Sequence, residues 1–209
     1  MSLGLPDWQR MWQELGARST SGGLLNQLMA AYSQQHRRYH TLQHLRECLL
    51  HAQATRTLAQ RPAEVELALW FHDAVYDPQR DDNEARSAQW ARASIDQAGC
   101  DPVVGERVSA LVLATRSHAA STDPDTQLVL DIDLAVLGAS PARFDEYEAQ
   151  VRAEYAHVSD ADWRAGRSRL LQRFLDRPRL YLTDAYHGAL EARARDNLAR
   201  SLQALSGGA

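Results

Sequence analysis

The sequence predicts an all-α fold, from its composition, its apolar periodicity and the positions of its helix-breaking residues. Ala, Leu, Arg, Glu and Gln dominate the 209 residues, whereas the alternating runs of Val, Ile, Thr and aromatic residues that are typical of strands are scarce. Hydrophobic residues make up 44% and charged residues 24%, which are ordinary values for a globular protein large enough to bury a substantial core. These values fit an enzyme and a binding protein equally well.

The helix limits follow from the residues that start or stop helices. Ser21-Gly22-Gly23 separates the first two predicted helices, and Gly99 ends the fifth. Pro62, Pro102 and Pro141 each stand at a helix start, where a backbone N–H would have no intrahelical partner. No stretch has the composition of an interdomain linker. The predicted helices cover residues 6–16, 23–34, 39–57, 62–75, 82–98, 102–117, 126–137, 141–156, 160–175 and 186–205.

Charge and cysteine content narrow the class of protein. A net charge of -4 argues against general nucleic-acid binding, which needs a basic face to meet phosphates. Cys48 and Cys100 are far apart and have no CxxC spacing, so we expect neither a disulfide framework nor a thiolate zinc site, and Cys48 is interpreted as a small buried apolar residue. The start of the chain lacks an apolar signal core, and no apolar run is long enough to span a bilayer. We therefore expect a cytoplasmic protein that is not inserted in a membrane.

A histidine and an aspartate close the apolar run of the predicted helix 62–75. His72 continues the i, i+3, i+4, i+7 apolar stripe that begins at Val65, so it is expected to face the core. Asp73 follows about 100° further round the helix. Both side chains can meet at one point only at the edge of the core. The alternative is a buried imidazole bound to a backbone carbonyl.

Two further histidines begin the predicted helix 39–57. His40 and His44 are i, i+4 neighbours, which places them on one face of that helix. The flanking Arg37, Arg38 and Tyr39 add donors that are compatible with a phosphate group. The alternative is an ordinary solvated helix edge.

Two aspartates interrupt the apolar run 128–134. Carboxylates are rarely buried without a cation or an ion-pair partner, so Asp131 or Asp133 is a candidate metal ligand. On a helix these two side chains point about 200° apart, so only one is expected to face a site. The alternative is that the run bends at Asp131 and Asp133 caps the next short helix; one aspartate can do this while the other binds a metal.

Taken together, these motifs resemble the HD-domain superfamily of metal-dependent phosphohydrolases. The likeness is strongest to a bacterial group of predicted HD phosphohydrolases, and it extends through Glu154-Tyr155 and Arg167. The resemblance implies one HD-like helical domain over residues 1–209, with a metal-site core at about 36–137 and additional C-terminal helices at about 141–205. The segments that carry the likeness are Arg38-Tyr39-His40 through His44, residues 70–77, Asp82-Asn83-Glu84 and residues 131–135.

The resemblance also implies roles for single residues. The metal ligands would be His44, His72, Asp73 and Asp133, with Asp131 as the fallback for the last. The first motif is similar to that of cyclic-nucleotide phosphodiesterases, which makes His40 the proton donor. Thr41 stands where those enzymes usually have Asn, so the likeness does not extend to cyclic-nucleotide specificity.

The implied chemistry is hydrolysis of a phosphoester in a nucleotide or another small phosphorylated metabolite by metal-activated water. Ligands without thiolates suit one or two ions of Mn, Fe, Co, Ni, Zn or Mg. Asp73 could also anchor the attacking water or bridge two ions. The alternative is a catalytically inactive module that senses a nucleotide, and the oligomeric state is open, with a homodimer as one option. Secondary candidates are Glu84 and His118 for water orientation or further ligation, and Arg38, Tyr155 and Arg167 for substrate contact, although packing and surface roles are favoured for Tyr155 and Arg167.

Overall fold

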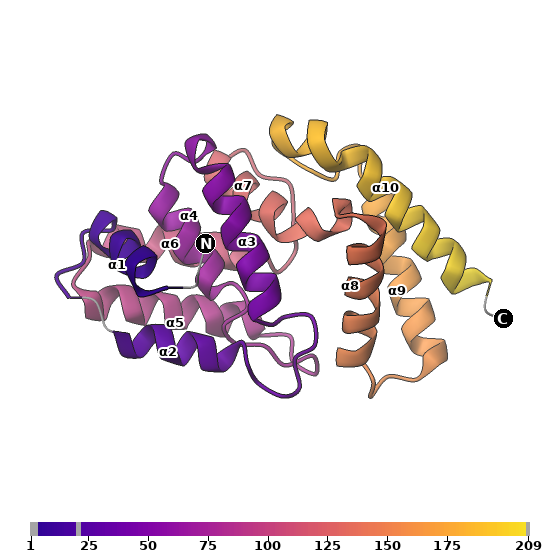
Figure 1. The fold of residues 1–209 in the computed structure, drawn as a ribbon, viewed down its shortest axis with the longest axis horizontal. Helices are drawn as coiled ribbons and strands as arrows, with labels where there is room; N and C mark the ends of the chain where they lie inside the picture. The colour runs from indigo at the N-terminus through magenta and orange to yellow at the C-terminus, as the bar shows by residue number, and fades with distance from the viewer. Residues whose placement is uncertain (1–3, 20–21, 208–209) are drawn as a thin grey trace. The chain divides into compact units, whose positions relative to one another are not determined.

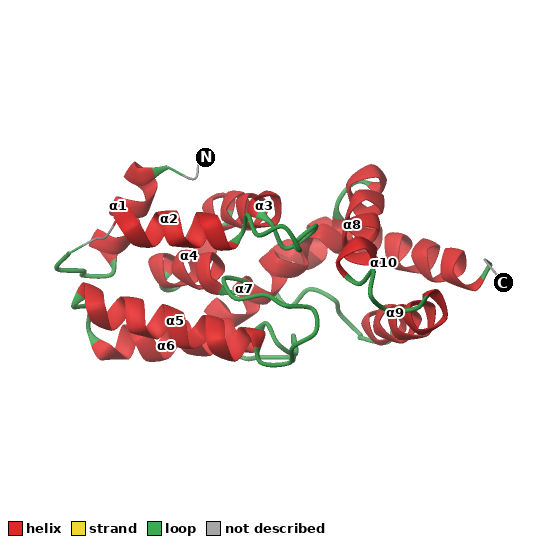
Figure 2. Cartoon of the chain, turned by 90° about the horizontal axis from the view of Figure 1, so that it is seen from below, coloured by secondary structure: helices red, strands yellow, loops and turns green. Residues whose placement is uncertain are grey.

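The computed structural model describes residues 4–19 and 22–207, and over these residues the fold is all-α, as predicted (Figure 2). The chain divides into two compact units, residues 1–133 and residues 134–209. The proposed single domain over the whole chain stays a prediction. None of the described helices is both long enough and apolar enough to cross a membrane.

The first unit is built around one buried helix (Figure 1). Every residue of α4 from Ala63 to Phe71 is buried, and α4 packs against α1, α3, α5, α6 and α7. A helix that is buried on every side has no face to offer to solvent, so the other helices surround it. The elements of this unit are α1 (Leu5–Glu14), α2 (Gly22–Ala31), α3 (Leu42–Ala54), the 3-10 helix η1 (Arg56–Leu58), α4 (Pro62–Phe71), α5 (Asn83–Ala98), α6 (Pro102–Ala114) and α7 (Pro124–Asp133).

The charged residues of α4 are buried with partners. Glu64 accepts a hydrogen bond of 2.7 Å from Nε of Arg107 on α6. Glu66 lies 3.0 Å from Nη2 of Arg10 and 3.4 Å from Nη1 of Arg56. Because a buried carboxylate without a cation is costly, these pairs explain how glutamates fit into a helix at the centre of the unit. They also tie α4 to its neighbours α1 and α6.

The second unit contains the 3-10 helix η2 (Leu134–Gly138), α8 (Pro141–Glu154), α9 (Asp160–Leu175) and α10 (Asp184–Ser206), and α10 packs against both α9 and η2. Asn197 on α10 donates to the carbonyls of Leu137 and Ala139 at 2.9 Å and 3.0 Å. A Cβ at Gly138 would lie only 2.7 Å from Cβ of Leu190. Glycine therefore permits the close approach of η2 to α10.

Three predicted helix limits near the candidate ligands differ from the structure. Helix α3 begins at Leu42 rather than at residue 39, because Thr41 is its N-cap and accepts from the backbone N–H of Gln43. Helix α4 ends at Phe71 rather than at residue 75. The predicted helix 126–137 is two elements, α7 and η2, which meet between Asp133 and Leu134. As a result, the candidate residues at 40, 72 and 73 all lie outside helices.

Candidate metal centre

Four side chains from three segments of the first unit meet at one point. We call His44, His72, Asp73 and Asp133 the donor cluster; they come from α3, from the turn after α4 and from the last residue of α7. The Nε2 atoms of His44 and His72 are 3.1 Å apart. Oδ2 of Asp73 lies 3.0 Å from Nε2 of His72 and 3.5 Å from Nε2 of His44. Oδ1 of Asp133 lies 3.2 Å from Nε2 of His44 and 3.6 Å from Nε2 of His72.

These separations match those of atoms that share one ion. Two ligand atoms that are each ~2.1 Å from a metal lie about 3.0 Å apart at a right angle and about 3.4 Å apart at the tetrahedral angle. The measured range of 3.0 to 3.6 Å brackets both geometries. Two imidazole nitrogens and two carboxylate oxygens also form a donor set that suits first-row divalent metals. These five separations are therefore compatible with one divalent ion.

The second nitrogen of each imidazole is already engaged. Nδ1 of His72 donates to the carbonyl of Leu69 at 2.7 Å, which leaves Nε2 with the lone pair of the neutral ring. Nδ1 of His44 lies 3.0 Å from the hydroxyl of Tyr39. Such partners fix the tautomer and the orientation of metal-binding histidines. A hydrogen bond from His72 to a backbone carbonyl was the alternative to a role as metal ligand. Because that bond uses Nδ1, His72 could still bind a metal through Nε2.

Burial makes the charges of the donor cluster interdependent. Burial alone would lower the pKa of His72, but the carboxylates of Asp73 and Asp133 raise it well above its ordinary value. Burial likewise opposes ionisation of the two aspartates. The charge of His72 nevertheless lowers the pKa of Asp73, and hydrogen bonds from His118 and His44 lower the pKa of Asp133 well below its ordinary value. Two buried carboxylates this close to two imidazoles need a proton or a cation between them. A divalent ion would supply that charge.

Cys48 is a donor that the sequence did not identify. It lies one helical turn after His44 on α3, and its Sγ is 3.7 Å from each ring nitrogen of His44. With His44, His72 and Asp133 it forms a buried group whose donor atoms all lie within 4.8 Å of one another and which could hold a metal ion. Burial and the nearby charges of Asp133 and Asp73 raise the pKa of its thiol well above the ordinary value. The i, i+4 spacing to His44 was a signal that could have identified it.

His40 lies beside the donor cluster, in the segment before α3. Its ring stacks on Tyr76 with 4.0 Å between centroids, and its centroid is 6.0 Å from that of His44. The helical i, i+4 relation expected for His40 and His44 is wrong, because residue 40 precedes the helix. The loop nevertheless brings the two imidazoles together. The role of His40 as a proton donor stays a prediction.

His118, Asp131 and Asp133 have different positions relative to the donor cluster. Nε2 of His118 lies 2.8 Å from Oδ2 of Asp133, the oxygen that does not face His44. His118 has φ 47, an unfavourable left-handed conformation for a non-glycine residue. Asp131 is buried within α7, whereas Asp133 contributes to the donor cluster. Glu84 is half-buried in the first turn of α5, and its role stays a prediction.

The candidate substrate residues have different surroundings. Arg38 is exposed in the loop before α3. Arg37, expected to offer donors to a phosphate, is instead buried and donates to backbone carbonyls. Tyr155 and Arg167 belong to the second unit, where Arg167 is buried and Nη2 donates to the hydroxyl of Tyr147 at 2.7 Å. This contact agrees with the packing role that was favoured for Arg167.

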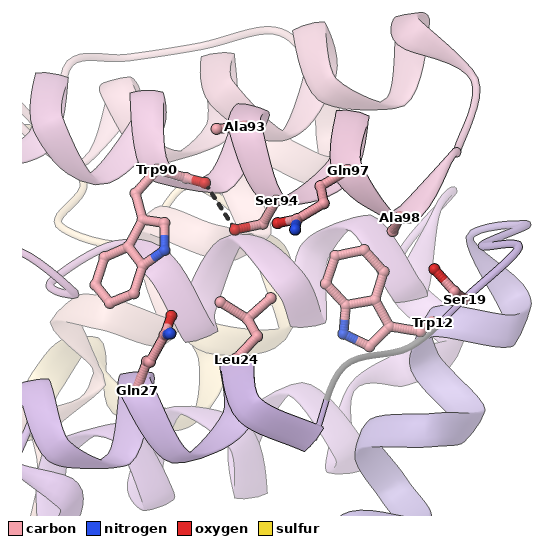
Figure 3. Close-up of a pocket in the computed structure, with 9 residues that line it drawn as sticks. All are labelled: Trp12, Ser19, Leu24, Gln27, Trp90, Ala93, Ser94, Gln97 and Ala98. Atoms are coloured by element: carbon pink, nitrogen blue, oxygen red, sulfur yellow. Dashed lines mark hydrogen bonds between the residues drawn. The ribbon is translucent and has the colours of Figure 1, made fainter.

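A cavity of about 260 Å³ lies elsewhere in the first unit, between α1, α2 and α5 (Figure 3). The indoles of Trp12 and Trp90 lie on either side of Leu24 in this view, and Ser94 donates to the carbonyl of Trp90. Among the residues that the structure describes, its lining contains no charged side chain and none of the candidate site residues. The cavity therefore offers no charged group to a phosphate.

No protein-family model matches the chain, and comparisons with curated proteins and with solved structures find no match either. The helical fold and the buried metal-binding group fit an HD-like protein.

Proposed function

We propose that this protein is a metal-dependent phosphohydrolase of the HD type, which cleaves a phosphoester of a nucleotide or another small phosphorylated metabolite. The observation that supports this proposal is the donor cluster itself, with two imidazole nitrogens and two carboxylate oxygens at separations of 3.0 to 3.6 Å. The sequence resemblance to HD phosphohydrolases supplies the reaction class. The geometry of the donor cluster supports the binding of a metal ion.

The residues that would hold the ion are His44, His72, Asp73 and Asp133. A bound divalent ion would lower the pKa of a water ligand to about 7 and neutralise charge on the phosphoryl oxygens. As the resemblance implies, Asp73 would also orient the attacking water, and its side chain is 16% exposed. Its position is equally suited to bridging a second ion, so the proposal includes one or two ions.

His40 would donate a proton to the leaving oxygen. Its imidazole is outside the donor cluster but adjacent to it, and stacking on Tyr76 restricts the orientation of the ring. A positioned general acid typically contributes about 10²- to 10⁴-fold to a rate. Because the imidazole is not among the proposed ligands, its removal should slow turnover without releasing the ion.

The decisive experiment is elemental analysis of the purified protein, followed by a panel of nucleotides and phosphorylated metabolites assayed with the metal found. His72→Ala and Asp73→Ala should lose bound metal and hydrolysis together. His40→Ala should keep the metal and lose about 10²- to 10⁴-fold in turnover. His51→Gln removes another histidine from α3 that is not part of the donor cluster, so it serves as the matched control.

Two results would contradict the proposal. If the metal-loaded protein hydrolyses no compound in the panel, it is not a phosphohydrolase of this class. If it also binds a nucleotide saturably without forming product, the inactive sensing module is the better description. Equal metal content in His72→Ala and the wild type would show that the donor cluster is not the metal site.

A further inference from the structure

Arg37 is a buried arginine, and each of its three guanidinium nitrogens donates a hydrogen bond to another residue of the protein. Only 3% of it is exposed, in the loop between α2 and α3. Nη1 donates to the carbonyl of Asp73 at 2.6 Å and to that of His40 at 3.1 Å, and Nη2 donates to the carbonyl of Ala74 at 3.0 Å. A single guanidinium therefore connects the segment that bears His40 with the turn that bears Asp73, although the two are distant in sequence.

The turn after α4 needs such partners. The last carbonyls of a helix have no intrahelical donor, and buried carbonyls without one are costly. Tyr32 supports the same turn: its hydroxyl donates to the carbonyl of Trp70 at 3.2 Å and accepts from the backbone N–H of Asp73 at 3.3 Å. The guanidinium carbon of Arg37 lies 5.1 Å from the centre of the Tyr32 ring. The two side chains thus hold the backbone on both sides of His72.

The contacts of Arg37 require the shape of arginine. Its planar fork presents several N–H groups at fixed angles, whereas the ammonium of lysine is a compact charge on a flexible stem. Three carbonyls from two segments accept from two nitrogens, and Nε donates to Oε1 of Gln34 at 3.2 Å. Lysine could keep the positive charge but could not reproduce this pattern.

We propose that Arg37 is a positioning residue for the metal centre, which fixes the turn of His72 and Asp73 against the loop of His40. It acts through the backbone of these residues and contacts neither ion nor substrate. The inference rests on the proposed metal binding of the donor cluster, but not on the nature of the substrate.

The chain offers a matched control in the second unit. Arg195 on α10 also donates to three backbone carbonyls after a helix, those of Leu175, Arg177 and Pro178, at 3.0, 2.7 and 3.2 Å. Like Arg37 it binds backbone carbonyls near a helix end, but its side chain is 31% exposed and also pairs with Glu191, and it lies in the unit that does not contain the donor cluster. A variant at Arg195 should lose stability for the same reason, without an effect on metal binding.

The test compares Arg37→Ala, Arg37→Lys, Arg195→Ala and the wild type in two measurements, the thermal midpoint and the affinity for Mn²⁺ or Co²⁺ by chelator competition. We expect about 10- to 100-fold weaker metal binding in both Arg37 variants, in line with the loss of other residues that orient metal ligands. Arg195→Ala should bind the metal as the wild type does, although its midpoint is reduced. If Arg37→Ala fails to fold, Arg37→Lys, which keeps the stem and the charge, still decides the question.

The outcomes separate this inference from the proposed function. If the wild type binds the metal and the Arg37 variants bind it equally well, Arg37 is merely structural and the inference is wrong. If Arg37→Lys matches the wild type, charge rather than the fork is what matters, and the geometric argument is wrong. A wild type that binds no metal would overturn the metal centre and, with it, the task assigned to Arg37, whereas metal binding without hydrolysis would overturn only the reaction class.

Discussion

At the level of single residues, His72 and Asp73 are adjacent in the chain, and their donor atoms Nε2 and Oδ2 lie 3.0 Å apart. Consecutive residues on a continuous helix point about 100° apart, which would separate these atoms. The chain leaves the helix after Phe71, and this lets both side chains turn toward His44 and Asp133. The end of α4 at Phe71 therefore allows the side chains of His72 and Asp73 to face the same point.

His118 is the strained residue at the site, and its substitution gives a prediction with two independent readouts. Asn tolerates a left-handed conformation better than Ala, so His118→Asn should be about 0.5–1 kcal/mol more stable than His118→Ala. Both variants remove the contact to Asp133, so both should bind the metal about 10-fold or more weakly. Urea unfolding and metal titration measure the two effects. Wild-type affinity in both variants would show that His118 does not orient Asp133.

The residue identities of the donor cluster could be predicted from the sequence, whereas their geometry could not. His72, Asp131 and Asp133 stood out because they close or interrupt apolar runs, whereas the choice of His44, and of Asp133 over Asp131, came from the resemblance to HD phosphohydrolases. The end of α4 at Phe71 has no local signal before Asp77-Pro78; it is accompanied by bonds from Arg37 and Tyr32, which are distant in sequence. Long-range contacts of this kind have no pattern in a single sequence.

At the level of elements, α4 and α7 are held together at both ends. Asp125, in the first turn of α7, is buried and accepts from the backbone N–H groups of Gln60 and Arg61, at 2.7 and 3.1 Å, just before α4. The other ends of the same two helices carry His72 and Asp133 of the donor cluster. Asp125 thus helps to align the helices on which the metal centre depends.

Removal of the Asp125 carboxylate should therefore be strongly destabilising. Asp125→Ala leaves two backbone donors and the guanidinium of Arg61 without their acceptor, and we expect a loss of about 2–4 kcal/mol in the free energy of unfolding. Asp123→Ala is the matched control, because Asp123 caps the same helix from an exposed position, at Thr126, and should cost about 1 kcal/mol. Urea denaturation of both variants gives the comparison. Equal losses would mean that Asp125 is only a helix cap.

Helix starts could be predicted more reliably than helix ends in this chain. Pro62, Pro102 and Pro141 begin α4, α6 and α8 as expected, because a proline at the first turn is a local preference that depends on few other residues. Gly99 ends α5 in a left-handed conformation, also as expected. Where no glycine or proline follows the last helical residue, as in α4 and α7, tertiary contacts determine where the helix ends.

At the level of the whole molecule, the donor cluster lies in the first of the two compact units, and it joins three of its segments. A ligand that binds only the folded state stabilises it by mass action. The metal-free cluster also keeps two carboxylates buried, one of them, Asp133, with its side chain only 15% exposed. Metal binding should therefore raise the free energy of unfolding, whatever the substrate is.

Removal of the metal should lower the unfolding temperature of the protein. At a free metal concentration of about 100 times Kd, binding contributes about 2.7 kcal/mol, which corresponds to roughly 5–10 °C for a chain of this size. Differential scanning calorimetry with and without a chelator measures the shift. His72→Ala should show no response to chelator, because it lacks one of the ligands, whereas Cys100→Ser, which alters a buried cysteine outside the metal-binding group, should respond as the wild type does. If the metal-free and metal-supplied wild type unfold at the same temperature, the donor cluster does not bind the metal and the proposed metal centre is wrong.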